Sequence, residues 1–295
     1  MIQSGVALAF SSIPGVADTH LFGTGTPDLL IEIPHGATDT TDFTSLQAQL
    51  TSTLPEGLVD FFHVNTDVGA PELALAIAEN LEGMGRTVAI VRCRVPRTFI
   101  DCNRRMDASP SDFKAGRVTP GLMPWITTDE DRALLRSLYD QYSAVVAAVG
   151  ADTILMLHSY APRDVDVEVD GNIVAKLRHA YQPEVEPTWP LRPELDIISR
   201  ALDGTNYAPV EVATALRENL AAVGVTVADG STYPLHPSTV AWDHVMARPG
   251  RALCVEVRRD LLADPFSPFV QMNIGAANVA RLARPFASAL RRWWS

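Results

Sequence analysis

Cysteines and long apolar runs are scarce in this sequence. The 3 cysteines, Cys93, Cys102 and Cys254, are odd in number and lack CxxC spacing, which indicates buried thiols of a reducing cytoplasm rather than disulfides or metal ligands. No apolar run approaches the roughly 18 residues that a membrane-spanning helix needs. The apolar N-terminus has no basic residue ahead of it, unlike a secretory signal. We therefore expect a cytoplasmic protein without a membrane partner.

Positive charge is also missing from much of the chain. The first 85 residues contain no Lys or Arg, and the formal net charge is −11 at pH 7. An acidic chain without a basic stripe is not typical of proteins that bind nucleic acid, so we expect no nucleic-acid partner. Positive charge is concentrated in the short segment 92–105, which is a candidate anion pocket. Its arginines are Arg92, Arg94, Arg97, Arg104 and Arg105.

Several well-known catalytic motifs are absent. The sequence has no HExxH, no GxSxG, no GxxxxGK[ST] and no GxGxxG. These absences disfavour thermolysin-like proteases, serine hydrolases with a nucleophile elbow, and nucleotide-binding proteins.

Length and periodicity predict one α/β domain. The chain has 295 residues, 47% hydrophobic, which is the upper edge of a single domain, so we expect one domain over 1–295. Strand and helix patterns alternate, which favours a sheet with helices on both faces. Predicted strands lie at 28–34, 58–64, 87–91, 153–157, 225–228 and 252–255. Predicted helices lie at about 43–53, 71–84, 128–149, 193–203, 211–223 and from 272. The alternating VDVEV string before Asp170 and Gly171 predicts an inserted β-hairpin at about 162–182.

Three apolar strands end on residues that could perform chemistry. They lead to His35, His158 and Glu256, and the carboxyl ends of strands in an open α/β sheet are where ligands bind. Two imidazoles and a carboxylate there would make a Zn²⁺ site with a general base. Either histidine alone is equally typical of a loop residue that binds backbone carbonyls. A third ligand is needed, and Asp67, in a turn before a helix, is the first candidate. His63 is the competing candidate for this ligand. Alternatively, Asp67 binds no metal and only stabilises the positive end of the helix dipole.

Glu256 and the segment from Arg97 to Arg104 complete the candidate site. A carboxylate inside an apolar strand is costly, so Glu256 is either paired with a neighbour such as Arg258 or functional as a proton acceptor. Asn103 and Arg104 together suit a carboxylate, because the guanidinium donates two parallel hydrogen bonds and the amide adds a third. Asp101 would orient an arginine, and Arg97 is a candidate donor to a developing oxyanion.

Five motifs, taken together and in this order, resemble those of the N-formylglutamate amidohydrolase family. They are IPHGA at 33–37, TDVGAPELA at 66–74, RTFIDCNR at 97–104, LHSYAPR at 157–163 and VEVRRDLL at 255–262. That family is similar in fold to the zinc carboxypeptidases and to the aspartoacylase group. The resemblance implies a three-layer α/β/α sandwich of the phosphorylase/hydrolase type with a mixed, mainly parallel sheet.

The resemblance also implies a site and an activity. One zinc ion would be held by His35, His158 and an acid, either Asp67 or Asp39. Glu256 would be the general base, and the Asn103–Arg104 pair would hold a substrate carboxylate. We therefore expect a zinc-dependent amidohydrolase for a small-molecule N-acyl amino acid, first of all N-formyl-L-glutamate, which would give glutamate and formate. The alternatives are a carboxypeptidase-like or other deacylase, a non-catalytic binding protein of the same fold, and a metal-free hydrolase that uses Ser159.

Overall fold

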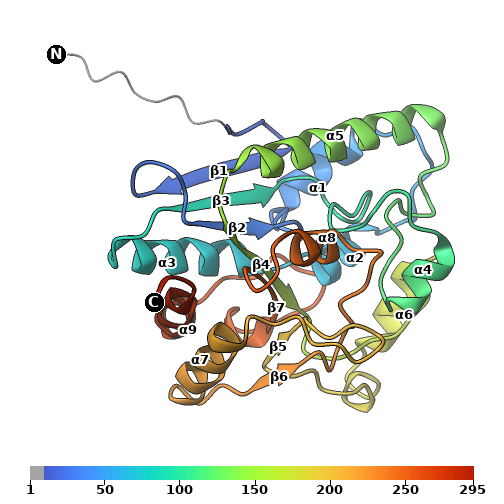
Figure 1. Cartoon of the computed structure of the whole chain (residues 1–295). Helices are drawn as coiled ribbons and strands as arrows, with labels where there is room; N and C mark the ends of the chain where they lie inside the picture. The colour runs from blue at the N-terminus through green and yellow to red at the C-terminus, as the bar shows by residue number, and fades with distance from the viewer. Residues whose placement is uncertain (1–9) are drawn as a thin grey trace.

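A seven-stranded sheet organises the computed structural model, which describes residues 10–295 (Figure 1). The strands follow one another across the sheet in the order β1 (Ala17–Phe22), β3 (Val88–Cys93), β2 (Leu29–Ile33), β4 (Thr153–Tyr160), β7 (Ala252–Arg258), β5 (Leu195–Ile197) and β6 (Val227–Asp229). β1 pairs antiparallel with β3, and β5 with β7, while the other neighbours are parallel. The expected mixed, mainly parallel sheet is therefore confirmed.

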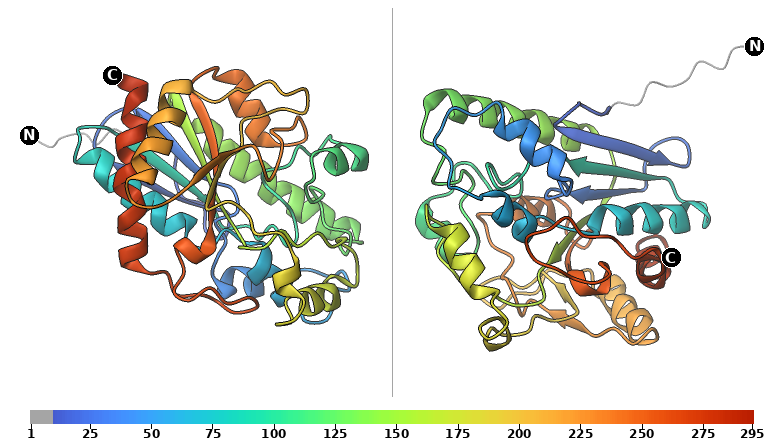
Figure 2. Two further views of the ribbon diagram at one scale, coloured as in Figure 1. Left: turned by 90° about the horizontal axis from the view of Figure 1, so that it is seen from below. Right: turned by 180° about the vertical axis from the view of Figure 1, so that it is seen from behind.

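Helices cover both faces of this sheet, as the two views in Figure 2 show. One core contains side chains of α1 (Thr40–Gln47), α2 (Val59–Asn65), α5 (Asp129–Ala148), α6 (Ile173–Ala180) and α8 (Val240–Ala247). The other core contains side chains of α3 (Ala70–Glu82), α7 (Val210–Ala221) and α9 (Ala276–Leu290). A short helix, α4 (Pro110–Ala115), follows the arginine-rich segment, and 3₁₀ turns occupy Glu186–Thr188, Arg259–Leu261 and Arg291–Trp294. The three-layer α/β/α arrangement is thus confirmed.

Local sequence explains several of these elements. Pro71 stands in the first turn of α3, where a missing N–H is harmless, and Leu73, Ile77 and Leu81 then bury one stripe of the helix. At the start of α5, the Thr128 hydroxyl accepts a hydrogen bond from the backbone of the third helical residue. None of the helices within residues 10–295 is both long and apolar enough to cross a membrane.

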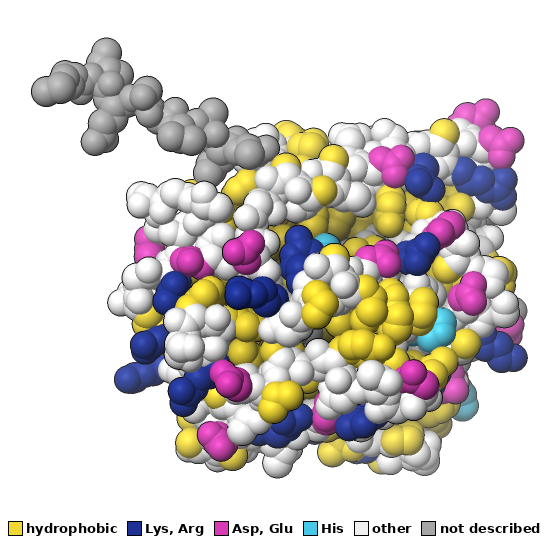
Figure 3. Space-filling model, viewed as in Figure 1, with side chains coloured by type: hydrophobic (Ala, Val, Ile, Leu, Met, Phe, Trp, Pro, Cys, Tyr) yellow, Lys and Arg dark blue, Asp and Glu magenta, His cyan; other side chains and the backbone are white. Residues whose placement is uncertain are grey.

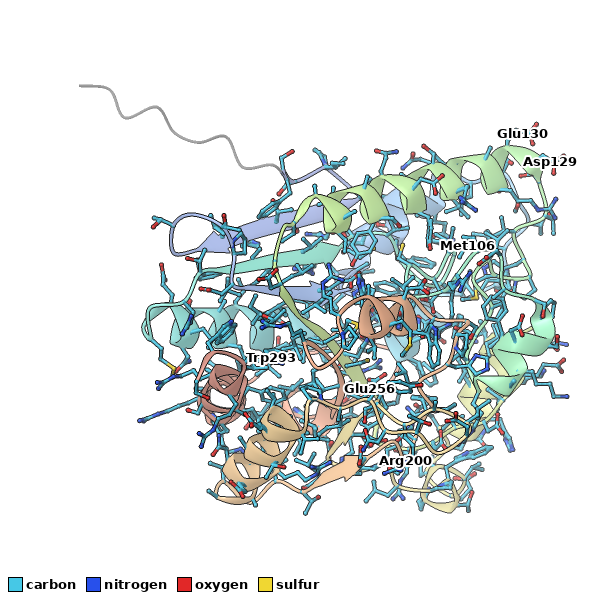
Figure 4. The ribbon with its side chains drawn as sticks, viewed as in Figure 1. Met106, Asp129, Glu130, Arg200, Glu256 and Trp293 are labelled. Carbon is cyan, nitrogen blue, oxygen red and sulfur yellow. The ribbon has the colours of Figure 1, made fainter. Side chains whose placement is uncertain are left out.

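The two-residue period of the strands places the central polar side chains. Along β4, Leu155 and Leu157 lie in one core and Met156 lies in the other. Because side chains alternate between faces, His158 continues on the side of Met156. β7 follows the same alternation, and His158 is the register partner of Glu256. Figure 4 shows Glu256 near the middle of the molecule, on this central strand.

The predicted β-hairpin at 162–182 is wrong. Residues 164–169 form a loop without strand pairing, and α6 follows. Ile173, Val174 and Leu177 recur at helical spacing and are buried, so the helix hides an apolar stripe that a hairpin could not. Asp170, expected in a hairpin turn, instead accepts hydrogen bonds from the Asn172 backbone and the Lys176 ammonium group.

Two further predicted elements have the wrong type. The segment 58–64 is helix α2 and not a strand, because Leu58, Phe61 and Phe62 are buried at helical spacing. The segment 193–203 contains the short strand β5 and not a helix, since pairing with both β6 and β7 overrides its local helix preference. β1, α4 and α8 lack a sequence signal strong enough to predict them.

Charged side chains of both signs are interspersed on the face shown in Figure 3. On α5, Arg132 pairs with Asp129 at 2.9 Å and Arg136 pairs with Asp140 at 2.9 Å. All four side chains are at least half exposed, and such pairs contribute less than about 1 kcal/mol each.

Candidate metal centre

Three ligand atoms converge where β2 ends and β4 carries its histidine. His35 follows β2, Asp67 lies between α2 and α3, and His158 lies within β4. The Nδ1 atoms of the two histidines are 3.2 Å apart, and Asp67 Oδ2 lies 2.8 Å from His158 Nδ1 and 3.3 Å from His35 Nδ1. All three side chains are buried. The two imidazoles that the sequence predicted to share one site therefore do meet.

The spacing of these atoms fits one tetrahedral ion. Metal–ligand distances of about 2.0–2.1 Å would place tetrahedral ligand atoms about 3.3 Å apart. Two imidazole nitrogens and a carboxylate oxygen are also a donor set that zinc prefers. Asp39 and His63, the other candidates for third ligand, lie elsewhere. Asp39 caps α1 by accepting from the Thr41 backbone, and His63 is buried on α2 against Phe62.

The two loops that carry His35 and Asp67 are tied together. The carbonyl of His35 accepts hydrogen bonds from the Asp67 backbone N–H at 3.1 Å and from the Thr66 hydroxyl at 3.2 Å. Gly36 permits the Arg92 side chain on β3 to lie close to it, because a Cβ at position 36 would be 2.6 Å from Arg92 Cγ. The glycine of the PHG sequence therefore has a packing reason, because a larger residue at position 36 would require the Arg92 side chain to shift.

Asp101 fixes the orientation of His35. Its Oδ1 lies 2.7 Å from His35 Nε2, so the ring keeps a proton on that nitrogen and turns Nδ1 toward Asp67. Imidazoles that bind metals commonly have such a carboxylate behind them. Burial alone would raise the pKa of Asp101, but Arg104, His35 and Arg97 together hold it well below its usual value. The expectation that Asp101 orients an arginine is correct, and the carboxylate also holds the histidine.

The predicted substrate-binding residues surround this carboxylate. Arg97 Nη2 donates to Asp101 at 2.9 Å, and its Nη1 lies 3.3 Å from His35 Nδ1. Arg104 pairs with Asp101 at 3.2 Å and donates from Nε to the Thr119 carbonyl. Asn103 accepts at Oδ1 from the backbone N–H of residue 241 at the start of α8. Arg97 and Arg104 therefore border the metal centre, while Asn103 also anchors a helix.

Glu256 faces the metal centre without a cationic partner. Within the described chain its Oε2 is a buried atom with no hydrogen bond, and no arginine or lysine lies within ion-pair distance. Arg258, the neighbour that could have neutralised it, pairs with Asp260 at 2.7 Å. Burial raises the pKa of Glu256, with His158 acting in the opposite direction and Asp67 adding to the rise. A half-buried carboxylate with one buried oxygen that has no structural partner favours the functional interpretation.

One buried arginine was part of a recognised motif but received no role from the sequence. Arg259 is 2% exposed and donates to the carbonyls of Val64 at 2.5 Å and Ser159 at 3.3 Å. Burial lowers the pKa of its guanidinium to about 10. Because Val64 lies just before Asp67 in sequence and Ser159 just after His158, Arg259 joins the two segments that carry these ligands.

The sequence analysis also did not identify Arg192 and Tyr233, which contact each other. Arg192 Nη2 donates to the Tyr233 hydroxyl at 2.7 Å, and the guanidinium lies over the rings of Tyr160 and Tyr233 at 5.1 and 5.5 Å. Both residues interact electrostatically with Glu256. They come from irregular segments, so no periodicity could have indicated them.

Solved structures share this fold. N-formylglutamate amidohydrolase from Ralstonia eutropha JMP134 matches with a TM-score of 0.58 and 19% identity, over 95% of this chain and 99% of that one. A gene product of Agrobacterium tumefaciens matches with a TM-score of 0.54 and 18% identity, over 96% of this chain and 97% of that one. At such identities the likeness shows the fold. No curated protein sequence matches the chain.

The sequence itself decides the family. The family model described as N-formylglutamate amidohydrolase matches residues 27–263, a range that holds every residue of the metal centre described above. The resemblance seen in the five motifs is thereby confirmed. The chain belongs to the N-formylglutamate amidohydrolase family, and it contains a buried cluster of His35, Asp67 and His158 that could hold a metal ion.

Proposed function

We propose that the protein is a cytoplasmic, zinc-dependent amidohydrolase that cleaves the amide bond of an N-acyl amino acid. N-formyl-L-glutamate is the first substrate to test, and its hydrolysis would release glutamate and formate. The observation that carries the proposal is the convergence of His35 Nδ1, Asp67 Oδ2 and His158 Nδ1 within 3.3 Å of one another, with Glu256 as the strand partner of His158.

Glu256 would move the proton in this reaction. A zinc ion in the cluster would supply Lewis-acid polarisation of the acyl oxygen and of a water molecule. Glu256 would accept the proton of the attacking water at its unpartnered Oε2 and pass it to the nitrogen of the leaving amine. A pKa raised by burial suits a group that must first accept and then donate a proton.

Arg97 would stabilise negative charge as it develops on the acyl oxygen. Its Nη1 lies 3.3 Å from the ligating nitrogen of His35, so it reaches the immediate surroundings of the metal centre. Its Nη2 is fixed on Asp101, which orients the guanidinium before substrate arrives. Donors that are already oriented stabilise a transition state without the cost of reorganisation.

Arg104 and Asn103 would hold the carboxylate of the substrate. Arg104 donates one hydrogen of Nη1 to the Asn103 carbonyl, which leaves the second hydrogen of that nitrogen for a ligand. The Asn103 amide oxygen accepts from the start of α8, and its amino group makes no hydrogen bond within residues 10–295, so it can donate to a ligand. Arg104→Lys keeps the positive charge near Asp101 but loses the two-pronged geometry, so we expect it to raise KM more than it lowers kcat.

A substrate panel with defined metal content tests the proposal. The purified chain, with zinc added or removed by a chelator, would be assayed on N-formyl, N-acetyl and N-succinyl amino acids. Zinc-dependent release of formate from N-formyl-L-glutamate supports the proposal. Faster cleavage of another acyl group would indicate a different deacylase, and bound zinc without any turnover would indicate a binding protein. Full activity in the presence of the chelator would indicate a metal-free hydrolase that uses Ser159. Against this alternative, the Ser159 hydroxyl is buried and donates to the Val68 carbonyl at 2.7 Å.

A further inference from the structure

A small polar cavity lies behind the loops that carry two of the metal-centre residues. Its volume is about 170 Å³. Its lining includes Thr38, Asp39, Gly69, Glu72, Arg92 and Gln271. Thr38 belongs to the loop of His35, and Val68 and Gly69 directly follow Asp67. None of the proposed metal-binding, catalytic or substrate-binding residues lines it, so it is separate from the metal centre.

Opposite charges face this cavity without pairing with each other. Arg92, on β3, donates from Nε to the Gly36 carbonyl at 2.7 Å and from Nη2 to the Thr38 hydroxyl at 3.1 Å, and its Nη1 makes no hydrogen bond within residues 10–295. Glu72, in the first turn of α3, has a buried Oε2 with no partner in the same part of the chain. The two groups interact electrostatically, yet they do not form an ion pair at 4.0 Å or less. A buried carboxylate oxygen and a guanidinium nitrogen are therefore both available to a ligand.

The remaining polar groups add one donor and one acceptor. Gln271 accepts at Oε1 from the Thr40 backbone and hydroxyl, so its amide nitrogen stays available as a donor. Asp39 accepts from Thr41 with Oδ1, so its Oδ2 stays available as an acceptor. A simple anion would be repelled by the two carboxylates, and a simple cation would be repelled by Arg92. A molecule that carries both charges satisfies all of these groups.

We propose that this cavity binds a free α-amino acid as a zwitterion, with its carboxylate on Arg92 and its ammonium group on Glu72. The volume is appropriate, since a protein cavity of about 150 Å³ holds a benzene-sized molecule of six heavy atoms. The cavity adjoins both loops of the metal centre, because Arg92 donates to the carbonyl of Gly36, next to His35, and Gly69 lies two residues after Asp67. The binding itself does not depend on the proposed function.

Calorimetric titration of the full chain with glycine, L-alanine and L-serine tests the site, and it requires no turnover. Acetate and methylamine, which carry only one charge each, serve as ligand controls. We expect at least one amino acid to bind with one site per chain, and neither control to bind at the same concentration. Binding of no amino acid at about 10 mM, or equal binding of acetate, overturns the proposal.

Substitutions then locate the bound molecule. Glu72→Gln removes the carboxylate that would hold the ammonium group, and a hydrogen bond to a charged group is worth a factor of about 10 to 100 in affinity, so we expect weakening in that range. Glu79→Gln, on the exposed face of the same helix, is the matched control and should bind like the wild type. Arg92→Lys is a second variant at the other end of the ligand and should also weaken binding. An affinity unchanged by both Glu72→Gln and Arg92→Lys would place the amino acid elsewhere and overturn the assignment, even for an active enzyme.

Discussion

Asp101→Asn removes one negative charge from the centre of the site with almost no change in shape. The wild-type carboxylate is fully buried and contacts His35 Nε2 at 2.7 Å, Arg97 Nη2 at 2.9 Å and Arg104 Nη2 at 3.2 Å. The asparagine would still accept hydrogen bonds at Oδ1, but its amino group would point at groups that are themselves donors. Two guanidinium groups would then lack their buried counter-charge.

The magnitudes follow from these contacts. Removing one partner of a buried ion pair costs about 3–5 kcal/mol of folding free energy. We expect the lower end, about 3 kcal/mol, because Arg97 is 16% exposed and water can reach part of it. Loss of the carboxylate behind a ligating histidine weakens metal binding by about 10- to 100-fold, which is about 1.4–2.8 kcal/mol.

Two assays separate the effects. Urea unfolding of the metal-free protein measures the first, and zinc competition with a calibrated chelator measures the second. Asp107→Asn is the matched control, because Asp107 is 70% exposed and its one ion pair within residues 10–295 is with Arg105, at 2.7 Å, and so should change neither quantity. Wild-type zinc affinity in Asp101→Asn would refute a contribution of the Asp101 negative charge to metal binding through His35, and wild-type stability would refute the stabilising role of the ion network.

Three other substitutions test separate parts of the structure. Glu256→Gln should keep bound zinc but lower kcat about 10²- to 10⁴-fold, and metal analysis of the assayed samples checks that zinc is retained. In the wild type, kcat/KM should fall as the pH drops through the raised pKa of Glu256. Arg259→Met should weaken zinc binding about tenfold in the chelator assay, because the link between the segments of Asp67 and His158 is lost. Asp131→Asn should cost about 2 kcal/mol in urea unfolding at pH 7, since the carboxylate accepts from the backbone of residues 51 and 52. Those contacts lower the pKa of Asp131, so its contribution to the free energy of unfolding is present above pH ~4 and is lost as the pH falls toward the folded pKa. Asp129→Asn, at an exposed site labelled in Figure 4, is the control and should change the free energy of unfolding by no more than about 0.5 kcal/mol at any pH.

The sequence predicted the part of the site that strands deliver. His35, His158 and Glu256 follow from two simple regularities: parallel strands end at one edge of a sheet, and side chains alternate between its faces. Such regularities are local, so a single sequence reveals them. The same reasoning failed at 162–182, where the alternating VDVEV string has no neighbouring strand to pair with and lies as a loop beside α6.

The supporting residues depend on contacts that no local pattern encodes. His35 and Asp101 are 66 residues apart, and Arg259 reaches a carbonyl 195 residues earlier in the chain. The choice of Asp67 over His63 also needed the fold, because 58–64 is a helix that turns His63 away from the two imidazoles. The two histidines and Glu256 could be predicted from the sequence, whereas the choice of Asp67, the contact of Asp101 with His35 and the role of Arg259 could not.

Anomalous diffraction at the zinc edge, from crystals of the zinc-loaded chain, tests the central claim most directly. The account predicts one strong peak per chain, within about 2.0–2.2 Å of His35 Nδ1, Asp67 Oδ2 and His158 Nδ1. A peak bound instead by Asp39 or His63, or the lack of any peak between the two imidazoles, would contradict it.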